Sequence, residues 1–142
     1  MYDSYTGSEG PVSFIKINKT MLQNKTTLVL GASLKPHRYS NLAIKKLVAY
    51  KHPVFAIGLK SGSIENVVIE TEKKLFEAID TVTLYLNEEH QKEYYEYIFS
   101  LHPKRIIFNP GAENKELATL AQQKRIQPLN ACTLVMLSTG QY

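Results

Sequence analysis

The sequence has a single cysteine and no long apolar run, and each shortage excludes a class of protein. One cysteine cannot form an internal disulfide framework, and without a CxxC pair or a Cys/His cluster nothing suggests a metal site. No uncharged stretch reaches the 18 residues that indicate a membrane-spanning helix. The first residues, MYDSYTGSEGPVS, contain neither the basic nor the apolar region of a signal peptide. We therefore expect a soluble, cytoplasmic protein that does not associate with membranes.

The length and the composition favour one compact domain. The 142 residues are 44% hydrophobic and 21% charged, which is too apolar for a disordered chain and too short for two ordinary domains. Residues 1–24 are rich in turn-forming residues, and we interpret them as a leader or arm. A clear hydrophobic pattern begins at residue 25, so the domain is placed at 25–142.

The apolar pattern alternates between buried strands and amphipathic helices. Strands are expected over 26–31, 53–58, 66–71, 81–86, 105–110 and 126–131. Helices are expected from residue 40, over 87–101 and over 111–125, with a weak one at 73–79 and a helix or apolar tail from 132. Strands that alternate with helices pair in parallel, and right-handed crossovers place the helices on both faces. The fold class is therefore α/β: a single-domain, doubly wound, mainly parallel sheet of about five to six strands.

The net charge of +4 hides an uneven distribution. Residues 16–60 carry nine basic residues and no acidic one, whereas 61–100 carry nine acidic residues against three lysines. A basic segment can bind nucleic acid or an anionic small ligand, or can simply be solvated. Only Lys35, Arg38 and Lys60 fall where a parallel sheet binds its ligand. The charge thus favours a multiply phosphorylated small molecule over nucleic acid.

The loop after the first strand, GASLKPHRYS (31–40), has the features of an anion site. Ligands of this fold class bind at the carboxyl ends of the strands, beside the first one. Small residues open the loop and permit close backbone approach, and Ser40 or Asn41 is suited to cap a helix whose N-terminus attracts anions. Two cations follow the small residues, and an arginine can bind a phosphate through two hydrogen bonds. An ordinary polar loop is the alternative. The candidate ligand-binding residues are Gly31, Ala32, Ser33, Lys35, Pro36, Arg38 and Ser40.

The usual nucleotide motifs are absent. Neither GxGxxG nor GxxxxGK[ST] occurs, which argues against a P-loop ATPase or GTPase. An NAD site would place an acid at the end of the second strand, but this strand ends at Gly58, followed by Lys60. Because Lys60 would pair with an additional phosphate, the site favours coenzyme A or NADP over NAD. A third loop contains Pro110 and Gly111, which either present backbone N–H groups to a ligand or only begin a helix.

Three segments in this order carry a resemblance: GASLKPHRYS, PGAE (110–113) and NACTLVML (130–137). Together they resemble the small stand-alone CoA-binding proteins, which are similar to the CoA-binding domain of succinyl-CoA synthetase. The resemblance covers the chain from Lys25 to the end and implies a Rossmann-like fold. It also implies coenzyme A, or an acyl-CoA, in a cleft at the ends of the first, second and fourth strands. The phosphates would lie at the loop described above, Gly58 and Lys60 near the adenosine, and Leu86 and Asn87 along the path of the ligand.

Catalysis is the weaker hypothesis. His37 lies in the phosphate loop, but no carboxylate or nucleophile partners it recognisably. Cys132 follows the last strand and would be reactive if its thiolate were favoured, although burial as a small packing residue is the simpler interpretation. We expect a nucleotide-binding module with no assignable catalytic residue. The alternative is a small NADP- or acyl-CoA-dependent enzyme that uses His37 or Cys132.

A third hypothesis is a nucleic-acid or protein-interaction module. The tyrosines of the expected 87–101 helix could stack on bases, but that segment is acidic and core or interface packing explains them better. The aromatic helix and the apolar tail could also support a homodimer, which the sequence alone does not decide.

Overall fold

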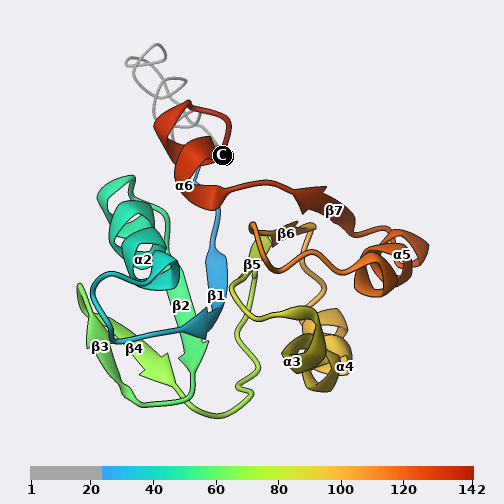
Figure 1. Ribbon diagram of the computed structural model, residues 1–142, viewed down its shortest axis with the longest axis horizontal. Coiled ribbons are helices and arrows are strands. Elements are labelled where there is room, and N and C mark those ends of the chain that lie inside the picture. Colours follow the sequence, from blue (N-terminus) through green and yellow to red (C-terminus); the bar gives the residue numbers. More distant parts are fainter. Residues whose placement is uncertain (1–23) are drawn as a thin grey trace, which may run out of the picture.

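The computed structural model describes residues 24–142, so the predicted leader lies outside the described residues except for Asn24. They form one seven-stranded sheet with the order β3-β4-β2-β1-β5-β6-β7 (Figure 1). All neighbouring strands are parallel except β3 and β4, which are antiparallel. The strands are β1 (Thr27–Ala32), β2 (Val54–Gly58), β3 (Gly62–Ile64), β4 (Val67–Glu70), β5 (Thr81–Leu84), β6 (Arg105–Phe108) and β7 (Gln127–Asn130).

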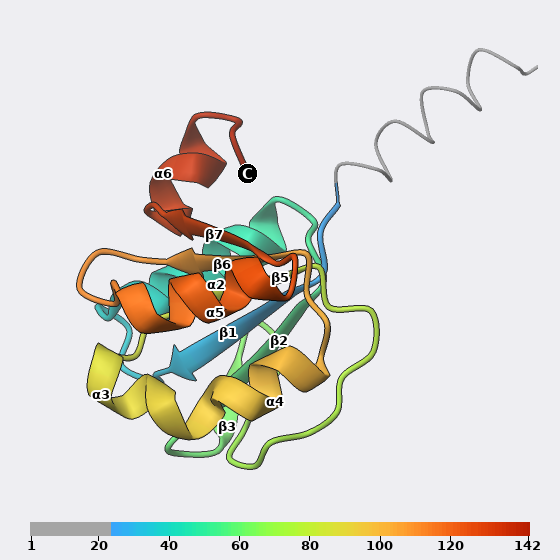
Figure 2. The same cartoon turned by 90° about the vertical axis from the view of Figure 1, so that its right-hand side faces the viewer.

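Helices cover both faces of the sheet. Figure 2 shows α3, α4 and α5 on one face and α2 on the other, and α6 contacts α2. The expected 87–101 helix is divided into α3, a 3-10 turn and α4. The chain therefore has the predicted α/β class and a Rossmann-like, doubly wound sheet. The helices are α2 (Tyr39–Ala49), α3 (Glu88–Gln91), η1 (Lys92–Tyr94), α4 (Tyr95–Ser100), α5 (Lys115–Gln123) and α6 (Thr133–Ser138).

The central strands are buried on both faces, which explains why they are continuous apolar runs rather than alternating ones. Leu28 and Leu30 of β1 contribute to the core beneath α4 and α5. Val29 points the other way, into the core that contains Ile44 and Leu47 of α2. Among residues 24–142, no helix combines the length and the apolarity that a membrane span needs.

Three local expectations were wrong. No strand is expected between 53–58 and 66–71, but this segment contains β3, because Glu65 and Asn66 adopt positive φ angles of 50° and 68° and fold Gly62–Ile64 back onto β4. Helix α2 begins at Tyr39, and its N-cap is Arg38 rather than Ser40 or Asn41. Helix α5, expected over 111–125, begins at Lys115 rather than at residue 111, because Asn114 caps it by accepting a hydrogen bond from the Leu117 backbone.

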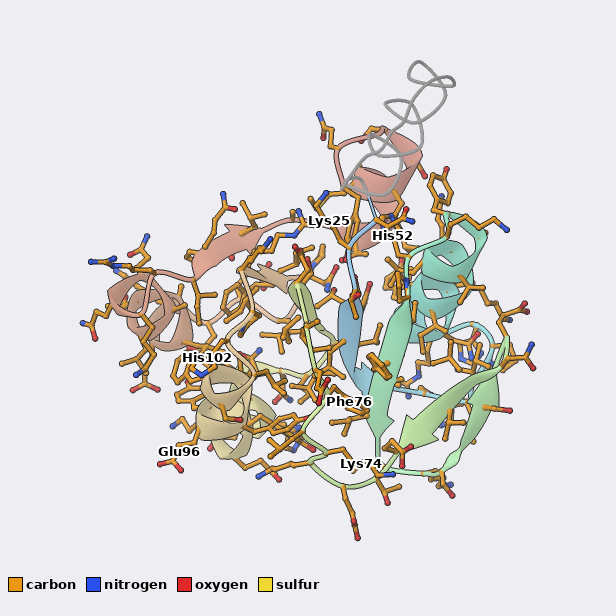
Figure 3. The ribbon with its side chains drawn as sticks, turned by 180° about the vertical axis from the view of Figure 1, so that it is seen from behind. Lys25, His52, Lys74, Phe76, Glu96 and His102 are labelled. Carbon is orange, nitrogen blue, oxygen red and sulfur yellow. The ribbon has the colours of Figure 1, made fainter. Side chains whose placement is uncertain are left out.

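The weak helix expected at 73–79 is also absent from the described residues. Ala78 has a φ of 59°, which a right-handed helix does not allow. Instead, the segment crosses the sheet face, where the ring of Phe76 stacks on Phe55 with centroids 4.4 Å apart (Figure 3). The Tyr97 hydroxyl donates a hydrogen bond to the Lys74 carbonyl and fixes the segment against α4.

Candidate functional site

Three loops meet at the carboxyl ends of β1, β5 and β6. These strands are neighbours and run in parallel, so the loops that follow them lie side by side at the same end of the sheet. The loops enclose a pocket of about 230 Å³. Its lining residues are Gly31, Ser33, Arg38, Tyr39, Ser40, Tyr85, Leu86, Asn87, Pro110, Gly111 and Ala112.

The structure brings most of the predicted site residues together around this pocket and leaves the others outside its lining. The eight that line it are Gly31, Ser33, Arg38, Ser40, Leu86, Asn87, Pro110 and Gly111. Ala32 is buried in the core under α2, whereas Lys35, Pro36 and Lys60 are exposed beyond the lining. Sequence reasoning missed Tyr39, Tyr85 and Ala112, each of which is a chain neighbour of a predicted residue.

Two glycines let the strand ends approach closely. Gly31 has a φ of 100°, and a Cβ there would lie 2.9 Å from the backbone carbon and oxygen of Tyr85. A Cβ on Gly58 would collide with the carbonyl oxygen of Ala32. Gly58 therefore supports the pocket from behind by allowing β2 to pack against the end of β1.

Ser33 organises the loop between β1 and α2. Its hydroxyl oxygen accepts a hydrogen bond from the Lys35 backbone at 3.1 Å, and its carbonyl oxygen accepts one from Asn41 Nδ2 at 3.0 Å. Asn41 is 2% exposed, so its end of this bond is buried. Asn41 therefore anchors the loop to α2 instead of capping the helix.

The N-terminus of α2 carries an uncompensated positive end. In the part of the chain that the structure describes, no side chain caps this helix, and its first turn contains no acid. The first backbone N–H groups of a helix have no intrahelical acceptor, and the helix dipole makes this end attractive to anions. Arg38 and Ser40, whose side chains carry a guanidinium and a hydroxyl, line the same wall of the pocket. This wall can bind an anion through backbone and side-chain donors together.

A buried asparagine fixes the opposite wall. Asn109 follows β6 and is 2% exposed. Its Nδ2 donates to Thr83 Oγ1 at 2.7 Å and to the Leu84 carbonyl at 2.9 Å, while its Oδ1 accepts from the Thr133 backbone at 2.9 Å. One side chain thus joins β5, β6 and α6 directly behind the Pro110–Gly111 turn.

Tyr85 is one of two tyrosines that line the pocket. Burial raises the pKa of its hydroxyl far above the usual value, so the phenol stays neutral at physiological pH. It packs against the core under α2. Because the Tyr85 hydroxyl oxygen is itself buried, it is not presented to a ligand in the pocket as an acid or a base.

The two residues considered for catalysis lie outside this pocket lining. His37 is exposed on the β1–α2 loop. Cys132 is the N-cap residue of α6 and is partly buried. Neither is therefore placed at the wall formed by Arg38 and Ser40.

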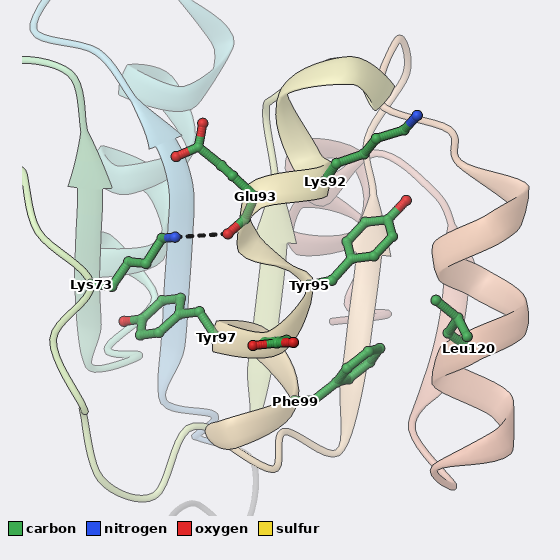
Figure 4. A pocket seen from close by; sticks show the side chains of 8 residues that line it. Lys73, Lys92, Glu93, Tyr95, Tyr97, Phe99 and Leu120 are labelled. Atoms are coloured by element: carbon green, nitrogen blue, oxygen red, sulfur yellow. Dashed lines mark hydrogen bonds between the residues drawn. The ribbon is translucent and has the colours of Figure 1, made fainter.

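A second hollow lies on the helical layer, away from the strand ends (Figure 4). It is lined mainly by α4 and its neighbours, and Lys73 crosses one side of it to donate a hydrogen bond from Nζ to the Glu93 carbonyl at 2.7 Å. Tyr97, which also lines it, is 7% exposed and belongs to the core, and Tyr95 is half-buried. Core packing therefore accounts for much of this aromatic cluster.

Solved structures share this fold over nearly the whole chain. A crystal structure of an uncharacterized protein is 44% identical, covers 84% of this chain and 98% of its own, and superposes with a TM-score of 0.82. A hypothetical protein from Pyrococcus horikoshii OT3 is 19% identical, with 96% and 98% coverage and a TM-score of 0.76. A comparison with curated protein sequences finds no match.

A larger enzyme contains a similar unit. The dinucleotide forming acetyl-coenzyme A synthetase 1 of Ca. Korarchaeum cryptofilum, in complex with phosphate and ADP, is 16% identical over 78% of this chain and 26% of its own, with a TM-score of 0.63. At this identity the likeness concerns the fold alone. The model of the CoA binding domain family matches residues 25–138. Because this match spans most of the chain, the protein belongs to the CoA binding domain family.

Proposed function

We propose that the protein binds coenzyme A or an acyl-CoA, with the phosphates at the N-terminus of α2. The observation that carries the proposal is the wall formed by the uncapped α2 N-terminus, Arg38 and Ser40. Backbone N–H groups and an arginine fork together suit a pyrophosphate better than a singly charged ligand. Family membership supports a CoA-related ligand.

The size of the pocket limits which part of the ligand it can hold. At about 230 Å³ it is smaller than the roughly 300–1,000 Å³ of sites that enclose a whole drug-sized molecule. We infer that it takes the pyrophosphate and the adjoining part of the pantetheine arm. The adenosine would extend along the end of β2 toward Lys60, whose exposed ammonium group is suited to a 3′-phosphate.

Calorimetric titration with CoA, acetyl-CoA, dephospho-CoA, NADP, NAD and ATP tests the ligand class. We expect CoA and acetyl-CoA to bind most tightly and dephospho-CoA more weakly, because it lacks the 3′-phosphate. Tighter binding of NADP than of CoA would favour the alternative nucleotide. Absence of binding by every nucleotide would overturn the proposal.

Arg38→Ala tests the phosphate wall. Removing a charged hydrogen-bond partner costs about 1.5–3 kcal/mol, which corresponds to roughly a 10- to 150-fold loss of affinity. The matched control is Lys104→Ala, which removes the same charge from a side chain that is 84% exposed at the amino-terminal edge of β6. Equal affinity of the two variants would remove Arg38 from the binding site.

A further inference from the structure

Gln91 lies completely buried at the end of α3 and connects two walls of the pocket. Its Nε2 donates one hydrogen bond to the Leu86 carbonyl at 2.8 Å and another to the Ala112 carbonyl at 2.7 Å. Leu86 belongs to the loop after β5 and Ala112 to the loop after β6, and both line the pocket. The two hydrogens of one amide group are therefore divided between two pocket loops.

The orientation of this amide is fixed from the other side. Gln91 Oε1 accepts a hydrogen bond from Asn114 Nδ2 at 2.9 Å. Asn114 cannot reverse its own amide without loss, because its Oδ1 caps α5 by accepting the Leu117 N–H at 3.1 Å. Turning the Gln91 amide over would place its oxygen against two carbonyl oxygens and leave both without a donor. Only the observed orientation satisfies every buried polar group in this network.

The bridge lies on the side of the pocket opposite the proposed phosphate wall. Arg38 and Ser40 belong to the β1 side, whereas Leu86 and Ala112 belong to the β5 and β6 sides. A dinucleotide-type ligand places its pyrophosphate at the first strand–helix turn. With the adenosine directed toward β2, the remaining arm must leave the phosphates between the loops that Gln91 joins.

We propose that Gln91 is a positioning residue that sets the spacing of these two loops for the pantetheine arm of coenzyme A. The inference rests on the proposed function for the identity of the ligand. Gln91 acts through the backbones of Leu86 and Ala112 and does not line the pocket itself. Its loss should therefore affect the arm of the ligand more than the adenosine.

The free protein tests the positioning role without any ligand. Gln91→Met keeps the length of the side chain and removes both donors, and Gln122→Met makes the same change at an exposed residue of α5. In amide hydrogen exchange, Gln91→Met should increase the rates at His90 and Ala112, whose N–H groups donate to the Asn87 and Asn109 carbonyls, at least tenfold and leave 28–30 unchanged. Gln122→Met should change neither region. Unchanged exchange in the two loops would overturn the proposal.

Binding then tests which part of the ligand depends on the spacing. Gln91→Met should lower the affinity for CoA about tenfold, as expected from two lost hydrogen bonds. It should lower the affinity for adenosine 3′,5′-bisphosphate less than twofold. An equal loss for both ligands would refute the assignment to the pantetheine arm. If the wild-type protein binds neither ligand, the proposed function fails, and the exchange experiment still decides whether Gln91 positions the loops.

Gln91→Glu provides a second variant if Gln91→Met does not fold. Its carboxyl group can donate one hydrogen bond only while protonated, and burial favours the protonated form. The ratio of loop exchange rates between this variant and the wild type should therefore be smaller at pH 5 than at pH 8. A ratio that does not change with pH would contradict the bridging role.

Discussion

The close approach of β1 and β5 makes a quantitative prediction for Gly31→Ala. An alanine at this position would adopt a φ of 100° and place its Cβ 2.9 Å from the Tyr85 backbone. A positive φ costs an L-residue about 1–2 kcal/mol. The steric contact adds about 1–3 kcal/mol, because a backbone carbonyl cannot move aside as a flexible side chain can. We expect the free energy of unfolding to fall by roughly 2–5 kcal/mol, out of the about 5–15 kcal/mol typical of a domain.

Gly111→Ala separates the two contributions. Gly111 has a similar φ of 92°, but no atom lies within 4 Å of a Cβ built there. It should therefore show only the conformational cost of about 1–2 kcal/mol. Urea denaturation followed by circular dichroism measures both variants against the wild type. Equal losses in the two variants would refute the steric argument, and a neutral Gly31→Ala would refute both parts of it.

Two further predictions concern residues outside the pocket lining. Burial lowers the pKa of His52, with smaller contributions from Lys25 and Arg105, and its Nδ1 accepts the Lys25 N–H at 2.9 Å (Figure 3). The unfolded chain, with a histidine pKa near 6.5, takes up a proton first as the pH falls. The stability from neutral His52 is thus complete above about pH 6.5 and lost below it. Between pH 7.5 and pH 5, the free energy of unfolding measured by urea denaturation should fall less for His52→Gln than for the wild type. Equal decreases would contradict this prediction. Asn109→Ala should lower the free energy of unfolding by about 1–3 kcal/mol, because it leaves buried hydrogen-bond partners unsatisfied. The control Asn130→Ala, at an exposed residue, should lower it by less than about 0.5 kcal/mol. Similar losses in the two variants would refute the role of the Asn109 network.

The sequence predicts most directly the central strands, whose side chains are buried on both faces of the sheet. Continuous apolar runs such as TLVL and RIIF are sufficient to place β1 and β6. Strand β3 has the sequence GSI, of which only Ile64 is buried, and it is a strand only because it pairs with β4. No local pattern encodes such pairing. The same holds for 73–79, whose path follows from the Phe76–Phe55 contact across the sheet.

The residues of the pocket likewise fall into those that the sequence indicates and those that it does not. Gly31, Ser33 and Arg38 could be selected because ligands of this fold class bind at the carboxyl ends of the strands, where the loop after the first strand lies. The pocket is completed by residues with no such signal. Gln91 and Asn109 are ordinary amides in sequence, and each becomes important only when strands distant in the chain bring carbonyl groups to it. Lys35 and Lys60 show the converse, because their charges suggested the site but their side chains lie outside the pocket lining.

The two outer strands of the sheet determine how copies of this protein can associate. An exposed strand edge is a template on which another chain can continue the sheet, and this leads to aggregation. One edge here is β3, which has only three residues. The other is β7, where Pro128 removes one backbone donor from a four-residue strand. Both edges of the sheet formed by residues 24–142 therefore disfavour strand addition, which favours docking of a second copy through side chains on a helical or sheet face.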